Sequence, residues 1–123
     1  MGGGGRQADV AQKIGSVQVV AQGLTGVSGR DLPALIDEHK ARLGSGIVVL
    51  IADTGGKAAV AAGVTDDLKE KLSAVDLVRS AVEALGGKGG GGRADLAQGG
   101  APSAENIDEA LEVVRAKVKE VLS

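Results

Sequence analysis

The sequence predicts an α/β (α+β) domain: one mixed β-sheet with a hairpin, packed against several helices, with an amphipathic helix at the C-terminus. Three observations lead to this prediction. Residues 47–52 are a short, continuous apolar run, as expected for a strand buried on both faces. Turn-forming residues at 53–56 join this run to a second apolar run, which indicates a hairpin. Apolar residues before and after these strands recur at helical spacing.

The N-terminal part of the chain predicts a linker, a strand and a long helix. Residues 1–12 are rich in glycine and are interpreted as a linker, because glycine runs have no preferred conformation. Residues 16–24 partly alternate apolar and polar side chains, which predicts a strand with one wetter face. Ser28 and Asp31 have the spacing of a capping box, and Pro33 follows in the first helical turn. The apolar stripe of this helix consists of Leu32, Leu35, Ile36, His39 and Leu43.

The middle of the chain predicts the second half of the hairpin and two helices. Residues 58–64 carry mostly small side chains and form the returning strand, so something packs close to their backbone. Residues 65–72 are expected to form a short helix, in which Asp66 and Asp67 serve as helix-start residues rather than paired catalytic carboxylates. Ser73 then caps a second helix. The stripe of that helix consists of Val75, Val78, Ala81, Val82 and Leu85.

After the second helix the chain predicts a glycine segment, a strand and a last helix. The glycine segment covers residues 86–92, and residues 96–99 are expected to form a short strand. Pro102 and Ser103 open the last helix, whose apolar residues alternate spacings of four and three. That stripe consists of Ile107, Leu111, Val114, Val118 and Val121. Its length of barely two heptads favours docking on the domain's own sheet over a coiled coil.

The composition limits the classes of function. The 123 residues suit one domain, and its core must consist of Val, Leu, Ile and Ala because Phe, Tyr and Trp are absent. Aromatic stacking on bases is therefore excluded. A net charge of −2 means that any binding of nucleic acid is local. The absence of cysteine excludes disulfides and thiol chemistry, and no bilayer-spanning run or signal peptide is seen, so a cytoplasmic chain without membrane contact is expected.

Catalysis by this chain is not expected. His39 is the only histidine, and it lies on the apolar stripe of the first long helix. It has no cysteine or second histidine with which to hold a metal ion, so we interpret it as a residue at the edge of the core. We therefore expect no catalytic residue, no metal site and no cofactor in this chain.

The glycine segment 86–92 is open to two interpretations. Glycine-rich composition alone favours a flexible linker between two packed elements. Against this, long unstructured loops inside a domain are usually functional, and free backbone N–H groups beside Lys88 and Arg93 form an anion site. The segment is not a phosphate-binding P-loop, because Gly89 rather than Ser or Thr follows Lys88. Nor does it fit a dinucleotide fingerprint, because a helix precedes it.

The residues that follow indicate a known family. Residues 89–100 read Gly-Gly-Gly-Gly-Arg-Ala-Asp-Leu-Ala-Gln-Gly-Gly. This run resembles the signature of the DHH-associated domain at the C-terminus of alanyl-tRNA synthetases, in which several glycines precede Arg-Pro-Asp-Met-Ala-Gln-Ala-Gly-Gly. Residues 63–68 and 73–78 are similar to the same family, as is the order of the elements. The resemblance covers nearly all the chain and implies one DHH-associated globular domain over residues 13–123.

Three departures from the family pattern are conservative. Ala94 stands in place of proline, which frees one backbone N–H; Leu96 replaces methionine; and Gly99 replaces alanine. None of them removes a charged or hydrogen-bonding side chain.

The resemblance implies a non-catalytic module that touches the tRNA elbow and helps present tRNA(Ala) to the aminoacylation and editing domains. Its implied partners are tRNA(Ala) and those other domains of the synthetase. ATP with Mg²⁺, and the zinc of the editing domain, would belong to the parent enzyme. The residues that the resemblance implies for contact with nucleic acid are Lys88, Gly89, Gly90, Gly91, Gly92, Arg93, Asp95 and Gln98.

Two alternatives remain open at this point. One is the related C-terminal, substrate-binding domain of DHH-family phosphoesterases, in which a histidine follows the glycines; here Arg93 has that place. The other is an oligomerisation module that uses the C-terminal helix. We expect weak self-association at most, because the apolar stripe is short and the chain has no aromatic anchor.

Overall fold

The sheet is mixed, as predicted. The computed structural model describes residues 11–14, 17–87 and 89–122. In this part of the chain six strands form one sheet, in the order β1-β2-β3-β4-β6-β5. The strands are β1 (Ala11–Ile14), β2 (Val17–Thr25), β3 (Gly46–Asp53), β4 (Ala58–Val64), β5 (Gly91–Gly92) and β6 (Leu96–Ala101). Strands β2 and β3 are parallel, and every other neighbouring pair is antiparallel.

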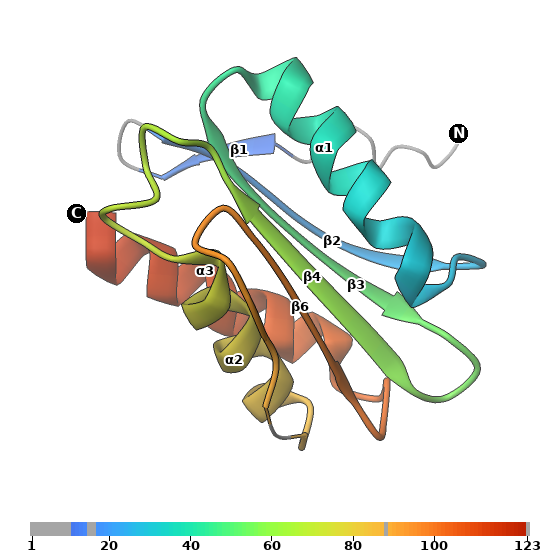
Figure 1. The fold of residues 1–123 in the computed structure, drawn as a ribbon. Helices are drawn as coiled ribbons and strands as arrows, with labels where there is room; N and C mark the ends of the chain where they lie inside the picture. Colours follow the sequence, from blue (N-terminus) through green and yellow to red (C-terminus); the bar gives the residue numbers. More distant parts are fainter. Residues whose placement is uncertain (1–10, 15–16, 88, 123) are drawn as a thin grey trace, which may run out of the picture.

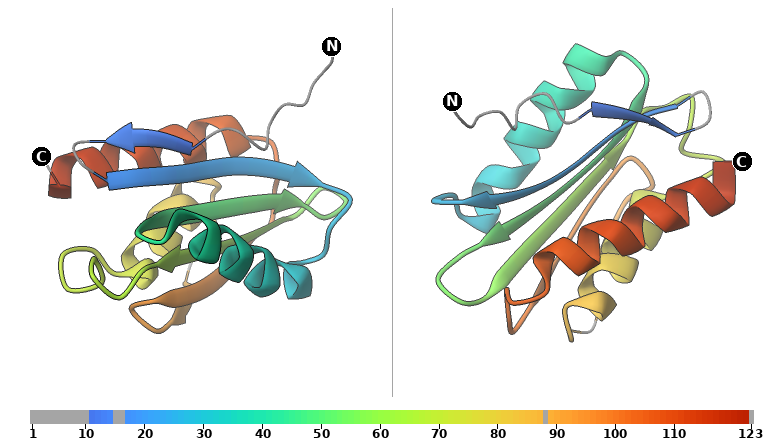
Figure 2. Two further views of the ribbon diagram at one scale, coloured as in Figure 1. Left: turned by 90° about the horizontal axis from the view of Figure 1, so that it is seen from above. Right: turned by 180° about the vertical axis from the view of Figure 1, so that it is seen from behind.

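Helices cover both faces of the sheet. Helix α1 (Leu32–Leu43) lies on one face, and α2 (Ala74–Ala84) and α3 (Ile107–Leu122) lie side by side on the other (Figures 1 and 2). A 3-10 turn, η2 (Gly29–Asp31), leads into α1. In this turn the backbone N–H of Ser28 donates to the Asp31 carboxylate at 3.3 Å, as expected for the predicted capping pair. Within the described residues no helix has the length and apolarity needed to cross a bilayer.

Strand β3 is central, which explains its unbroken apolar sequence. Its side chains alternate between two cores because successive residues of a strand point to opposite faces. Val48 and Leu50 pack in the core under α1, whereas Ile47, Val49 and Ile51 pack in the core under α2 and α3. All of them are fully buried. The prediction for residues 47–52 is thus confirmed.

Helix α1 packs unusually close to β4, and Gly63 makes this possible. A Cβ atom at Gly63 would lie within 2.3 Å of Ile36 Cγ2 and 3.0 Å of Lys40 Cδ, both on α1. The small residues of β4 therefore serve close packing of the helix, as their sizes predicted. Gly63 belongs to a stretch that resembles the family, and its role there is structural.

The prediction of a short helix over residues 65–72 is wrong. Hydrogen-bonded turns occupy residues 66–71 instead. The Thr65 hydroxyl accepts from the Gly46 N–H at 3.0 Å and donates to the Asp67 carboxylate at 2.6 Å, and Ser45 donates to the same carboxylate. These side chains join the end of β4 to the start of β3. Because Thr65 and Asp67 also bond to Gly46 and Ser45, which lie 19 and 22 residues away, they do not cap a local helix.

The last helix begins later than predicted. Helix α3 starts at Ile107, not at Pro102 or Ser103, because the N–H of Ala104 donates to the Gly56 carbonyl at 2.9 Å and holds this segment against the β3–β4 turn. Leu111, Val114 and Val118 are buried as expected. Val121 is 38% exposed, so the apolar stripe ends before it.

At the N-terminal end, strand β1 takes in Ala11 and Gln12, the last two residues of the range predicted as linker. Residues 1–10 lie outside the described part of the chain.

We predict that Gly63→Ala lowers the free energy of unfolding by about 1–3 kcal/mol, because the new methyl group overlaps Ile36. Urea denaturation measures this loss. In the double variant with Ile36→Ala the overlap is gone, so the two losses are expected to be less than additive. Strict additivity would contradict the proposed contact.

We also predict that Asp67 makes stability depend on acidic pH. The hydrogen bond from Ser45, and then that from Thr65, lower the pKa of Asp67 below its ordinary value. A carboxylate with a lowered folded-state pKa stabilises the fold above its unfolded pKa, and this contribution is lost as pH falls through the folded pKa. Asp67→Asn should therefore be less stable than wild type near pH 7, with a difference that shrinks below about pH 4.

Thermal unfolding across this pH range, with Asp66→Asn as the matched variant, tests the effect. Asp66 is exposed and pairs with Lys69 at 3.4 Å, so its loss should matter little near pH 7. Equal losses in the two variants would be evidence against the role of Asp67.

Candidate nucleic-acid interface

The glycine segment leaves α2 in a tight turn and then runs back along β6. Gly86 has a φ of 86°, and the N–H of Gly87 donates to the Val82 carbonyl at 2.9 Å, which closes the helix end. A Cβ atom at Gly87 would lie 3.0 Å from the Cα of Ala101 in β6. Glycine is needed here because the two backbones approach so closely.

Further along, the segment is fixed between α2 and β6. A Cβ atom at Gly90 would lie 2.8 Å from Val78 Cγ1 of α2, and one at Gly99 of β6 would meet the same atom at the same distance. Gly91 and Gly92 form β5 and pair with Gln98 and Ala97. The pairing and the close contact at Gly90 contradict the interpretation of residues 90–92 as a flexible linker.

The turn that follows β5 is tied to three other elements. The N–H of Arg93 donates to the Leu96 carbonyl at 2.8 Å and closes a hairpin whose turn residues are Ala94 and Asp95. The Ala94 carbonyl accepts from the Ala74 N–H at the start of α2 at 2.8 Å. The Asp95 carbonyl accepts from the Val64 N–H at 3.0 Å and from Lys40 Nζ of α1 at 3.2 Å. The sheet and two helices thus hold the turn in place.

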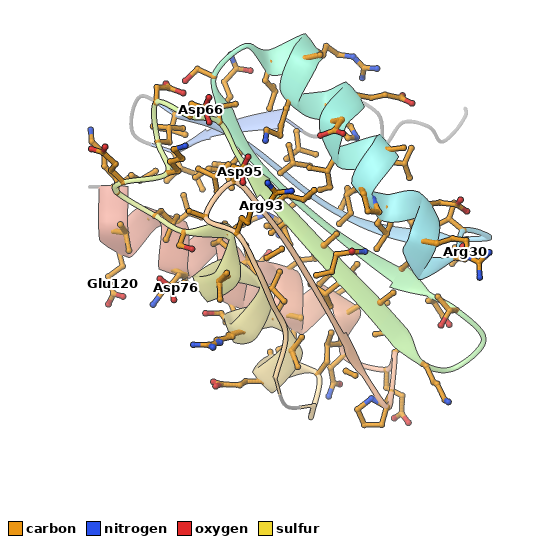
Figure 3. All side chains as sticks on the ribbon, viewed as in Figure 1. Arg30, Asp66, Asp76, Arg93, Asp95 and Glu120 are labelled. Carbon is orange, nitrogen blue, oxygen red and sulfur yellow. The ribbon has the colours of Figure 1, made fainter. Side chains whose placement is uncertain are left out.

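Arg93 and Gln98 point to the face of the sheet that carries α1. Ala97 and Ala101 of β6 belong to the core under α2 and α3, whereas Leu96 packs against the core under α1. Gln98 therefore points to the α1 side, and Arg93, the cross-strand partner of Leu96, does so too. Both side chains are exposed, and Figure 3 shows Arg93 and Asp95 close together there. Gln98 Nε2 donates to the Gly29 carbonyl of η2 at 3.2 Å.

The structure separates the predicted site residues into groups. Gly90 and Gly92 permit close backbone contacts, and Asp95 holds the turn through its carbonyl. Arg93 and Gln98 present polar groups to solvent, and exposed Gly91 pairs with Gln98, whereas exposed Gly89 lies toward α2. Lys88 lies outside the described residues.

Sequence reasoning missed Lys40 and Gly29 as neighbours of this surface. Lys40 is 55 positions from Asp95, and Gly29 is 69 positions from Gln98, so no local spacing pattern relates them. Only the packing of α1 on the sheet brings them together.

A family model described as the DHHA1 domain matches residues 16–120. The chain belongs to this family. The match confirms the resemblance to the DHH-associated domain that residues 89–100 indicated, and it extends across nearly every element of the fold.

Relatives and a solved structure of similar fold are known. The chain is 63% identical over 117 residues to "Alanine--tRNA ligase" of Dinoroseobacter shibae and 58% identical over 118 residues to that of Jannaschia sp.. These matches cover 95% and 96% of the chain but 13% of each relative. The structure is similar to the C-Ala domain from Aquifex aeolicus alanyl-tRNA synthetase, with a TM-score of 0.82 and 28% identity over 89% of this chain and 97% of that one.

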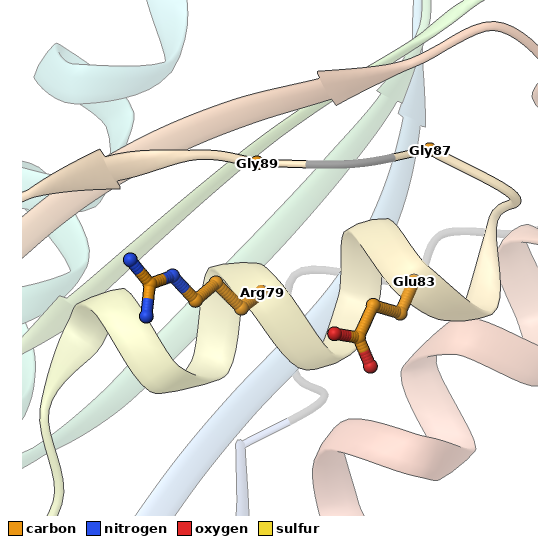
Figure 4. A pocket seen from close by; sticks show the side chains of 4 residues that line it. All are labelled: Arg79, Glu83, Gly87 and Gly89. Atoms are coloured by element: carbon orange, nitrogen blue, oxygen red, sulfur yellow. The ribbon is translucent and has the colours of Figure 1, made fainter.

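The opposite side of the glycine segment in this DHHA1 domain carries a depression. An open depression of about 380 Å³ lies between α2 and the segment, lined by Arg79, Glu83, Gly87 and Gly89 (Figure 4). One cationic and one anionic side chain line the depression, so its charge favours neither an anionic nor a cationic ligand. It therefore suits phosphate binding less well than the α1 side.

His39 lies on α1 and belongs to no metal-binding cluster within the part of the chain that the structure describes. Burial lowers the pKa of His39, Arg42 lowers it further, and Glu38 opposes the change. His39 is half-buried, in keeping with a residue at the edge of the core. Across the described ranges no three His, Asp or Glu side chains gather to hold a metal ion.

We predict that Gly92→Ala opens the β5–β6 hairpin while the rest of the DHHA1 domain stays folded. Gly92 has a φ of 148°, and a Cβ atom there would lie 2.6 Å from the Leu96 carbonyl oxygen and 2.7 Å from the Ala97 Cα. The expected cost is about 1–3 kcal/mol, confined to the edge of the sheet. Amide hydrogen exchange at Arg93, whose N–H bonds Leu96, measures the opening.

Gly91→Ala is the matched control, because a Cβ atom at Gly91 meets nothing within 4 Å. Its exchange rates should stay close to wild type. Unchanged protection of Arg93 in Gly92→Ala would show that the glycine is not required.

Proposed function

We propose that this chain is the C-Ala domain of an alanine–tRNA ligase, a non-catalytic module that binds the elbow of tRNA. The names of the relatives and of the similar solved structure support the parent enzyme. The observation that carries the binding role is the placement of exposed Arg93 and Gln98 on one face, beside exposed glycine backbone. Such a surface offers hydrogen-bond donors and charge without bulky side chains.

The chemistry of this surface fits the sugar–phosphate backbone of folded RNA. The guanidinium of Arg93 donates two parallel hydrogen bonds to a phosphate, and Lys40 adds a second positive charge nearby. Strand β5 lies at the edge of the sheet, so some of its backbone groups face away from β6. The glycine backbone lets an RNA surface approach closely, and shape rather than base sequence determines recognition.

The binding should be weak and sensitive to salt. The chain has a net charge of −2, so general attraction to RNA is absent and a few local cations carry the contact. In the whole ligase such a weak contact raises the effective concentration of tRNA(Ala) near the aminoacylation and editing domains. The ATP, Mg²⁺ and zinc sites then belong to those other domains, and the working compartment is the cytoplasm.

The two alternatives receive less support. The relatives are ligases rather than phosphoesterases, and Arg93 occupies the place that a histidine takes in the phosphoesterase pattern. For an oligomerisation module, α3 would need a free apolar face. Its buried residues instead pack on this domain's own sheet, and the two exposed valines of α3, Val113 and Val121, do not form an extended apolar face.

We predict that Arg93→Gln weakens binding of folded tRNA about tenfold or more at low salt, because a charge-assisted contact to phosphate is lost. The slope of log affinity against log salt should fall by about one. Titration monitored by fluorescence anisotropy measures both. Gly91→Val should also weaken binding, because its side chain projects from the open strand into the path of the RNA.

The matched control is Arg79→Gln, which makes the same change of charge on the opposite side of the glycine segment. Its affinity should fall much less than that of Arg93→Gln, because Arg79 does not contact an RNA that binds on the α1 side, and the remaining effect should vanish as added salt screens distant charges. If the Arg79 variant loses more than the Arg93 variant, RNA binds on the α2 side. If a tRNA without its folded elbow binds as well as intact tRNA, the proposal is wrong.

A further inference from the structure

Gln98 is held in one orientation by its neighbour. Its Nε2 lies 3.2 Å from the Gly29 carbonyl oxygen. A carbonyl oxygen only accepts hydrogen bonds, so the group that faces it must be the amide NH₂ and not the amide oxygen. The Gln98 Oε1 is therefore directed away from Gly29. Since the side chain is exposed, this acceptor is open to a ligand.

The surroundings of Gln98 leave that acceptor accessible. Its cross-strand partner in β5 is Gly91, where even a Cβ atom would meet nothing within 4 Å. Gly100, the next residue of β6 on the same face, is exposed as well. A ligand that lies along the hairpin thus reaches the amide oxygen across glycine backbone.

The cations next to Gln98 differ from it in hydrogen-bonding character. Arg93 is the diagonal cross-strand neighbour of Gln98. The backbones of such diagonal neighbours are roughly 7–8 Å apart, within reach of long side chains. Arg93 and Lys40 carry only donors, which suit phosphate oxygens. An amide oxygen beside them is suited to a different part of the RNA, one that donates.

We propose that Gln98 recognises a hydrogen-bond donor on the RNA, namely a ribose 2′-hydroxyl or the exocyclic amino group of a guanine. This inference rests on the proposed function and adds a chemical preference to it. The 2′-hydroxyl both donates and accepts and distinguishes RNA from DNA. The guanine amino group is the donor that a base pair presents in the minor groove. The Gly29 contact serves to keep the acceptor of Gln98 turned toward either group.

The test combines changes in the RNA with changes in the protein. Three folded tRNA transcripts are compared at low salt: one unmodified, one with 2′-deoxyribose at the outer-corner nucleotides, and one with inosine in place of the outer-corner guanines. Each is titrated against wild type, Gln98→Met and Gln18→Met. Met has nearly the length of Gln but lacks its amide. Gln18 is the matched control, because it lies on the same face but on β2, three strands from β6.

Wild type should lose roughly three- to tenfold in affinity with one of the two modified tRNAs, as expected for one neutral hydrogen bond. The RNA that shows the loss identifies the donor as ribose or guanine. Gln98→Met should bind unmodified tRNA more weakly by a similar factor. Its affinity for the modified tRNA should equal its affinity for the unmodified one. Gln18→Met should behave as wild type does.

Two results would overturn the proposal, and they are distinguishable from failure of the proposed function. One is a wild type that binds all three tRNAs equally, which needs no variant to observe. The other is a Gln98→Met variant that suffers the same loss as wild type on the modified RNA. A wild type that binds no folded tRNA at all would instead refute the proposed function, and this inference with it.

Discussion

Close approach of helices to the sheet is the constraint on which the rest of this structure depends. Without aromatic side chains the core consists of small apolar layers, and burial is gained by bringing backbones together. Helix α1 lies against Gly63, and α2 lies against Gly90 and Gly99. At each of these positions a single methyl group would overlap a helix side chain. The glycines therefore determine how far the helices stand from the sheet.

That distance also determines the position of the exposed hairpin. Because α1 lies so close to β4, Lys40 reaches the Asp95 carbonyl and Gln98 reaches Gly29. Because α2 begins directly under the turn, the Ala74 N–H reaches the Ala94 carbonyl. The family signature thus combines two functions in one stretch of chain. Its glycines and turn carbonyls fix the backbone, and in the proposed function its exposed Arg93 and Gln98 side chains bind the RNA.

Much of the fold could be predicted from the sequence because its signals are local. The apolar run of β3 and the cap at Ser73 are visible in a few consecutive residues, and both are confirmed. The helix predicted after Thr65 was wrong because Thr65 and Asp67 bond to Ser45 and Gly46, about twenty residues away. The site shows the same limit. Arg93 and Gln98 were predicted from a motif, and their binding role stays a prediction, whereas the contacts of Lys40 and Gly29 depend on tertiary packing that no motif shows.

An acidic domain is suited to a weak auxiliary contact with RNA. A strongly basic surface would hold any nucleic acid and release it slowly, since the affinity would come from phosphate charge alone. Here few cations lie on the α1 side, and the depression beside Arg79 and Glu83 carries both signs of charge. Under the proposed function, affinity depends on the fit of an RNA shape to the fixed hairpin, and a mismatched shape gains almost nothing. In the proposed function the module lets tRNA(Ala) move between two other domains of the ligase, and a combination of low affinity and fixed geometry suits that role.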